Sequence, residues 1–157
     1  MNTNHLKRFA QEARTKLISQ VGAKLEYVLT TDSSELRESA IQLKKLQETI
    51  NSTSKEQVID KVAYTWFNRL MALRFMDVND YQPIGTRVIT PKEGYTLPEL
   101  LDEAKQGNIS SDLPVKQQRV FDLLDGKIPS SNAQNEAYKE LLIGACNHLH
   151  KIFPFLF

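Results

Sequence analysis

The sequence has little of what common catalytic and binding motifs require. Its one cysteine, Cys146, excludes an internal disulfide and a cysteine-based zinc cluster. Its six glycines form neither a G-x-G-x-x-G dinucleotide fingerprint nor a Walker phosphate-binding loop. No apolar run approaches the roughly 20 residues of a membrane-spanning helix, and the start lacks a signal-peptide core. We therefore expect a cytoplasmic protein with no membrane partner.

Composition places the chain among ordinary globular proteins. It has 157 residues, of which 41% are hydrophobic and 25% charged, and this length corresponds to one domain. The net charge of +1 excludes a globally basic nucleic-acid coat and an acidic tail.

Apolar residues recur at steps of three and four through most of the chain, which predicts an all-α fold of about six helices. The first helix begins after Asn4, and Gly22 marks a bend or a break in it. The second covers about residues 34–50. Three further helices follow residue 96, and Ser131 with Gln134 forms an expected cap for the last one.

The third helix, over residues 55–79, is the expected centre of the bundle. Thr53 and Glu56 form a capping box at its start. Its second half is apolar almost all round, a pattern typical of a buried helix. Residues 81–95, with prolines and glycines, form a small irregular or β element. Within it, residues 87–90 favour a short strand or an ordered loop.

Charge is distributed unevenly along the chain. The first 24 residues carry five basic side chains against Glu12, a net charge of +4, which leaves −3 for the remainder. The candidate DNA-backbone contacts are Lys7, Arg8, Arg14 and Lys16. A solvated face and a surface for an acidic protein are the alternatives. No means of reading bases is evident.

Two arginines in the third helix, Arg69 and Arg74, stand among aromatic residues, where an unpaired charge is costly. Internal pairing is one interpretation, and Arg74 lies one turn from Asp77. The alternative is that one guanidinium faces DNA or a neighbouring domain.

No catalytic constellation emerges from the remaining residues. His148 and His150 lie two apart on a helix and therefore cannot chelate one metal together. Cys146 is within one helical turn of His150, but a small buried thiol is the expected state. The Glu103-Ala-Lys105 string resembles part of a nuclease motif, yet falls in a helix rather than on a strand. We expect no catalytic, cofactor or metal residue in this chain.

The sequence ends on Phe153, Phe155, Leu156 and Phe157, an unusually apolar terminus. We expect these side chains to face a further domain, so that residues 1–157 form a single helical domain at the N-terminus of a larger protein. The alternative is a tail docked on its own core.

Residues 63–76, AYTWFNRLMALRFM, resemble the N-terminal helical signature of the PglX family, the adenine-specific DNA methyltransferases of bacterial BREX phage-defence systems. The first 17 and the last six residues resemble the same family. The resemblance spans the chain but is dense only in this helix.

The resemblance implies a non-catalytic domain of a methyltransferase that modifies adenine N6 at a specific DNA site. The S-adenosylmethionine loop and the Asn-Pro-Pro-Tyr motif of the family have no counterpart here, and no Pro-Pro pair is present. The implied partners are the downstream methyltransferase domain, double-stranded DNA, other BREX components and phage DNA-mimic inhibitors. A free-standing helical protein-interaction module without a DNA role is the alternative.

Overall fold

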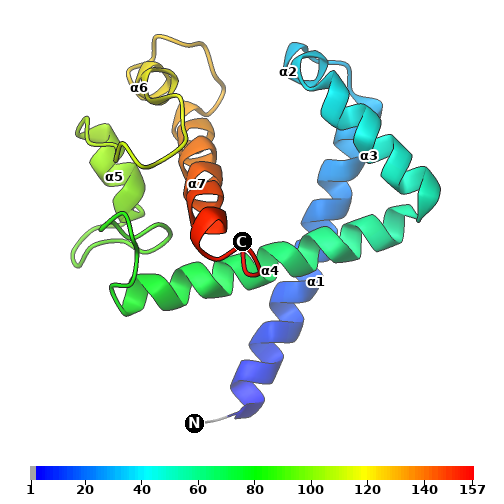
Figure 1. The fold of residues 1–157 in the computed structure, drawn as a ribbon, viewed down its shortest axis with the longest axis horizontal. Coiled ribbons are helices and arrows are strands. Elements are labelled where there is room, and N and C mark those ends of the chain that lie inside the picture. Colours follow the sequence, from blue (N-terminus) through cyan, green and yellow to red (C-terminus); the bar gives the residue numbers. More distant parts are fainter. Residues whose placement is uncertain (1–2) are drawn as a thin grey trace. The chain divides into compact units, whose positions relative to one another are not determined.

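The computed structural model describes residues 3–157, which contain helices and no strand, so the predicted all-α fold is confirmed. Figure 1 shows the helices in chain order. They are α1 (Thr3–Thr30), α2 (Ser34–Glu38), α3 (Ala40–Ser52), α4 (Lys55–Val78), α5 (Glu99–Lys105), α6 (Gln117–Leu124) and α7 (Ala133–Ile152).

The chain divides into two compact units, and the division falls inside α4. The first unit ends at Phe67, and the second comprises Asn68–Phe157.

Local sequence signals shift some helix boundaries from those predicted. Gly22 does not interrupt α1. The expected second helix is divided at Ser39, whose N–H donates to the carbonyl of Leu36 three residues back. Serine favours such local breaks because its side chain competes for backbone hydrogen bonds. At the start of α4 the cap is Ser54, whose hydroxyl accepts from the N–H of Gln57 at 3.1 Å, rather than Thr53.

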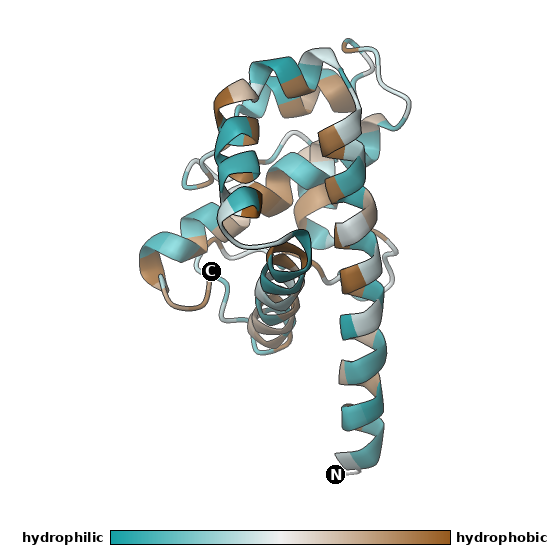
Figure 2. Ribbon diagram, turned by 90° about the vertical axis from the view of Figure 1, so that its right-hand side faces the viewer, coloured by the Kyte–Doolittle hydropathy of each residue, from teal (hydrophilic) through white to brown (hydrophobic). Residues whose placement is uncertain are grey.

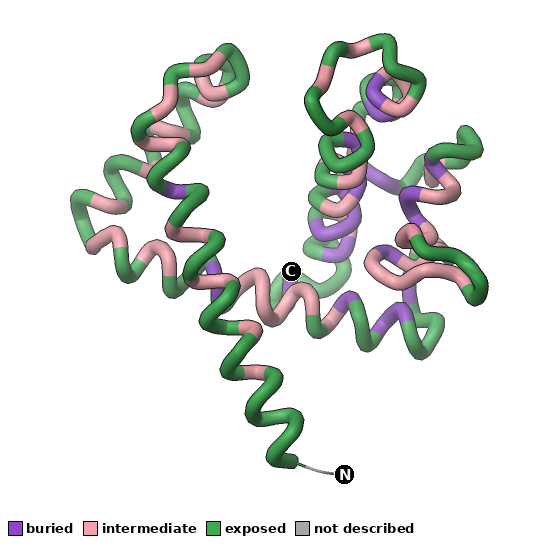
Figure 3. The backbone as a smooth tube through the Cα atoms, turned by 180° about the vertical axis from the view of Figure 1, so that it is seen from behind, coloured by how far each residue is buried: buried purple, intermediate pink, exposed green. Residues whose placement is uncertain are grey.

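In the first unit α1 lies against the first half of α4. A methyl group added at Gly22 would stand 3.7 Å from Cδ1 of Ile59, an ordinary contact distance. Lys55 of α4 forms a 2.7 Å ion pair with Glu26 of α1. Among the described residues of this unit, the buried apolar side chains are Leu25 and Ala63. Figure 3 shows that the N-terminal half of α1 is largely exposed.

The core of the second unit is built by α5, α6 and α7, which contact one another in pairs. Purple, buried segments concentrate on α7 in Figure 3. The buried apolar side chains of these three helices are Leu100, Leu101, Ala104, Val120, Leu123, Ala137, Leu141, Ala145, Cys146 and Leu149. They recur at helical spacing, so each helix turns one stripe inward.

The second half of α4 is buried on one face only, and the expectation of burial all round was wrong. Leu73 and Met76 are buried, whereas Met71, Phe75 and Val78 are exposed. Periodicity identified an apolar helix, but it could not show which of its faces has a neighbour.

Two helical glycines predict opposite effects of the same substitution. A Cβ at Gly144 of α7 would overlap with Cγ1 of Val115, a short and stiff side chain. We expect Gly144→Ala to lower the free energy of unfolding by about 1–3 kcal/mol through overpacking.

Gly22→Ala is the matched control, because the added methyl group meets only ordinary contact. It should raise the free energy of unfolding by about 0.5–1 kcal/mol, since alanine is the better helix former. Urea denaturation of the two variants checks both signs. A Gly144→Ala variant as stable as the wild type would contradict the close packing of residue 115 on α7.

Candidate functional site

A buried carboxylate organises the segment that follows α4. Asp77 is fully buried. Its Oδ1 accepts hydrogen bonds from the N–H of Val88 (2.9 Å) and from Nε2 of Gln82 (2.6 Å). Its Oδ2 accepts from the N–H groups of Ile89 (2.8 Å) and Thr90 (2.9 Å). Four donors therefore replace the water that the charge has lost.

The chain reaches this arrangement through a tight end to α4. Asp80 has a φ of 54°, in the left-handed region that aspartate tolerates better than most residues. The N–H of Tyr81 then donates to the carbonyl of Met76 at 2.8 Å. This reversal allows residues 88–90 to turn successive N–H groups toward Asp77. Because those groups bind a side chain, the segment is an ordered loop and not the strand considered from sequence.

The rim of this loop carries two arginines in different settings. Arg87 donates through Nε and Nη2 to Oδ1 of Asp80, at 3.2 and 3.0 Å. Arg74 donates to Oγ1 of Thr90 at 2.8 Å. Arg74 therefore does not pair with Asp77 one turn away, because the loop amides fill both oxygens of that carboxylate.

Tyr138 connects α7 to the same loop. Its hydroxyl donates to the carbonyl of Val88 at 3.0 Å. Burial, reinforced by the negative charge of Asp77, raises the pKa of Tyr138 to about 12. Loss of the proton would leave a buried anion against a carbonyl oxygen, so the neutral phenol is strongly preferred. The loop is therefore held from α4 by Asp77 and from α7 by Tyr138.

Arg69 and Cys146 lie close enough to interact. Arg69 is half-buried on α4, and Cys146 is buried on α7. Burial raises the pKa of the Cys146 thiol, and the nearby charge of Arg69 opposes this only in part. A buried thiol with a raised pKa is a poor nucleophile, which favours the structural role expected for Cys146.

A polar hollow beside the loop has its charges balanced internally. Asp80, Arg87, Lys92 and Glu99 are among its lining residues. Lys92 pairs with Glu99 at 3.5 Å and also with Glu103 of α5. Hydrogen bonds from Lys92 and, to a smaller extent, from Asn108 lower the pKa of Glu103, so it is held ionised. The hollow therefore offers no surplus positive charge for an anionic ligand. The pairing of Glu103 with Lys92 indicates a structural role for this carboxylate.

Four of the basic side chains predicted to contact DNA, those of Lys7, Arg8, Arg14 and Lys16, lie exposed on α1. Arg8 pairs with Glu12 at 2.7 Å, and Arg14 is 3.9 Å from Asp60. Lys7 and Lys16 form no ion pair with the described part of the chain. Figure 2 shows the hydrophilic character of this part of α1. Helix geometry places Lys7 and Arg14 near one line, and Arg8 and Lys16 lie further round the polar half, so the four do not form one tight stripe.

The C-terminal residues differ in exposure. Phe153, Phe155 and Leu156 are exposed, whereas Phe157 is buried. The carbonyl of Phe157 lies 2.6 Å from Nδ1 of His150, at hydrogen-bonding distance. The tail therefore combines a contact made within the second unit with side chains open to a partner.

The candidate residues form three groups. The basic residues of α1 lie in the first unit, while Arg69, Arg74 and the C-terminal residues lie in the second. Sequence reasoning missed the network of Asp77, Gln82 and Tyr138. A carboxylate in the apolar half of α4, just before a loop, was the available signal.

Among residues 3–157, none of the helices combines the length and the hydrophobicity of a membrane span. No group of three or more histidine, cysteine, aspartate or glutamate side chains in that range is arranged to hold a metal ion.

Comparison with known proteins confirms the resemblance found in the sequence. The whole chain matches an adenine-specific methyltransferase BrxX of Escherichia coli O9:H4 (strain HS), with 28% identity, and covers 14% of that protein. It also matches an adenine-specific methyltransferase PglX of Lacticaseibacillus casei (strain Zhang), with 30% identity, over 16% of its length. The chain thus spans about a seventh of each relative. No family model and no solved structure matches it.

The Asp77 network predicts a large loss of stability when its charge is removed. In Asp77→Asn one of the two carboxylate oxygens is replaced by an NH₂ group, which cannot accept hydrogen bonds. Two of the four buried N–H donors would therefore lose their acceptor. We expect the free energy of unfolding to fall by about 2–4 kcal/mol, as for other broken buried charge networks. Urea denaturation gives the difference directly.

Asp80→Asn provides the matched control, because this carboxylate is exposed and pairs only at the rim with Arg87. Its cost should stay below about 1 kcal/mol. Equal losses in the two variants would contradict the central role assigned to Asp77.

Tyr138 predicts a pH dependence at the alkaline end. Its pKa is raised from 10.0 to about 12, so its contribution to stability is complete below pH 10 and is lost as the pH rises through 12. The stability difference between wild type and Tyr138→Phe should therefore shrink over this window. A constant difference from pH 9 to pH 12, measured by urea denaturation, would contradict the buried hydrogen bond.

Proposed function

We propose that this chain is the non-catalytic N-terminal domain of a site-specific DNA adenine-N6 methyltransferase of a BREX anti-phage system. The observation that carries the proposal is the whole-length similarity to two proteins named adenine-specific methyltransferases, of which the chain spans only 14% and 16%. More than four fifths of each relative therefore lies outside the matched segment, which is enough to contain a catalytic region.

The catalytic chemistry then belongs to the rest of the polypeptide. This chain has no Pro-Pro pair and no glycine-rich cofactor loop. The downstream methyltransferase domain would bind S-adenosylmethionine, and this cofactor supplies the methyl group that is transferred to adenine. The present chain supports that domain and adds contacts to DNA or to protein partners.

The DNA contacts assigned to this domain are electrostatic. Lys7 and Lys16 are exposed on α1 without an ion pair among the described residues, so each is available to a phosphate. Arg8 and Arg14 form exposed pairs of low strength, which a phosphate group can replace. Arg74 on α4 is a further exposed donor. Such contacts position a protein on DNA without reading its sequence.

The exposed side chains of Phe153, Phe155 and Leu156 are assigned to the contact with the methyltransferase domain, and Phe157 anchors this tail within the second unit. Clustered exposed apolar side chains favour such an interface. Other BREX components and phage DNA-mimic inhibitors remain the further partners that the family resemblance implies, with α1 as the face suited to an acidic inhibitor.

The parent enzyme is tested by the size and activity of the native protein. An antibody to this domain should detect a product several times larger than 18.0 kDa in the source cell. Deletion of the gene should abolish N6-methyladenine at one sequence motif in genomic DNA, read by single-molecule sequencing. A native product of 18.0 kDa would instead favour a free-standing interaction module, for which the exposed apolar side chains also provide a surface.

DNA binding by α1 predicts a strong salt dependence in the full enzyme. The logarithm of the DNA-binding constant should fall linearly with the logarithm of the salt concentration. Each of the four phosphate contacts should add about −0.9 to the slope. The double charge reversal Arg8→Glu and Arg14→Glu should weaken binding at low salt and reduce the slope by about two contacts. Titration of fluorescent duplex DNA at several salt concentrations measures both effects.

The matched control reverses two exposed lysines of α3, Lys44→Glu and Lys45→Glu, with the same change of net charge in the same unit. Binding should weaken far less than in the α1 variant. Equal effects would mean that net charge, and not the α1 surface, determines affinity.

A further inference from the structure

An apolar surface lies on the side of α4 away from the core of the second unit. We call it the outer face of α4; it consists of Met71, Phe75, Val78 and, just beyond the helix, Tyr81. These side chains have exposed fractions of 37%, 59%, 51% and 63%. Single exposed apolar residues are ordinary, but a contiguous group marks an interaction surface.

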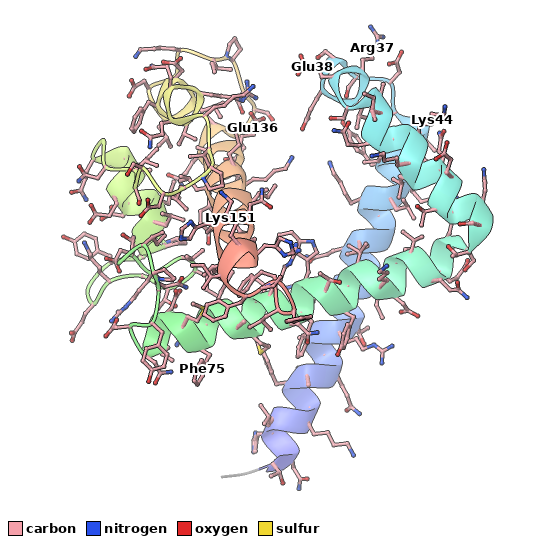
Figure 4. All side chains as sticks on the ribbon, viewed as in Figure 1. Arg37, Glu38, Lys44, Phe75, Glu136 and Lys151 are labelled. Atoms are coloured by element: carbon pink, nitrogen blue, oxygen red, sulfur yellow. The ribbon has the colours of Figure 1, made fainter. Side chains whose placement is uncertain are left out.

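Helix geometry explains why this face is separate from the core. Successive residues are rotated by about 100°, so Phe75 points roughly 200° away from buried Leu73. The steps of four and three between Met71, Phe75 and Val78 place them on one line. Figure 4 shows Phe75 on the side of α4 away from α7. The helix therefore presents two apolar faces, of which the second unit covers one.

The outer face is held in a fixed shape. The rings of Phe75 and Tyr81 meet edge to face, with centroids 6.0 Å apart and an interplanar angle of 62°. The N–H of Tyr81 donates to the carbonyl of Met76, which secures the residue against the end of the helix. Asp77 anchors the opposite side of the same helical turn. A surface ordered before contact loses little conformational entropy on docking.

We infer that the outer face of α4 docks onto an apolar surface of the methyltransferase region within the same polypeptide. This inference rests on the function proposed above and adds a second interface to the one assigned to the C-terminal residues. The occupant is a covalently attached domain, because the relatives that contain the equivalent of this chain are about six to seven times its length.

The size of the outer face favours a tethered partner over a second copy of the chain. Four partly exposed side chains present at most a few hundred Å², given roughly 150–250 Å² for a whole aromatic side chain. A stable dimer of free chains needs about 800 Å² from each partner. Interfaces between domains of one chain begin near 600 Å² in total, and the tether adds effective concentration.

Cysteine labelling tests the inference in the native, longer polypeptide. In Val78→Cys the new thiol stands on the outer face, while Cys146 is buried with a raised pKa and reacts slowly. The rate of alkylation at position 78 is measured by peptide mass spectrometry in the longer protein and in the 157-residue chain. We expect it to be at least about tenfold slower in the longer protein, because a docked surface opens only for a minor fraction of the time.

Glu136→Cys provides the matched control, as an exposed position on α7 (Figure 4), and should react equally fast in both proteins. Adding Phe75→Ser to Val78→Cys should restore much of the lost rate by weakening the docked state. Equal rates at position 78 in the two proteins would overturn the inference. The inference would also be overturned if alkylation at position 78 were slow in the 157-residue chain and became slower as the concentration of that chain increased. Such a result would indicate that a second copy of the chain covers the outer face of α4.

Failure of this inference is separable from failure of the proposed function. A longer protein that methylates adenine but leaves position 78 fully reactive would overturn the docking of α4 alone. Absence of adenine methylation, or a native protein of only 157 residues, would instead remove the proposed function and the inference with it.

Discussion

The structure of the second unit depends on one buried charge. Asp77 receives hydrogen bonds from three backbone N–H groups and one side-chain amide. Because a carboxylate left without such donors would be very costly in the interior, the loop has to close around it whenever α4 is packed. Closure also presents the carbonyl of Val88 to Tyr138. A single side chain thus orders the loop and positions the carbonyl group to which Tyr138 of α7 donates.

This constraint separates the two kinds of surface that the chain offers. Around the loop Arg87 pairs with Asp80 and Lys92 with Glu99, whereas Arg74 donates to the neutral hydroxyl of Thr90. Apart from Arg74, the second unit therefore has little free positive charge near its fixed loop, but it holds the outer face of α4 rigidly. Surplus positive charge lies on α1 in the first unit, where few side chains are buried.

Most helices were predictable because period and capping are local properties. Helix α7 begins at a polar cap, although Asn132 accepts from the N–H of Asn135 in place of the expected Ser131. What the sequence could not predict was non-local. The Arg74–Asp77 pair satisfied helical spacing, yet the carboxylate is taken by amides more than ten residues away. Arg74 reaches Thr90 instead. The apolar pattern of α4 likewise could not reveal that one face has no cover.

The candidate surfaces also limit what this domain can contribute to a DNA-modifying enzyme. Exposed lysines and arginines around α1 can attract phosphates, but such contacts are the same for every sequence. Selecting one adenine requires groups that reach base edges from a defined position, and α1 offers no such array. A domain that only holds the backbone improves methylation if it stays fixed relative to the catalytic region. An apolar interface such as the outer face of α4 supplies that fixed relation, because loosely tethered charges would bind DNA without orienting it.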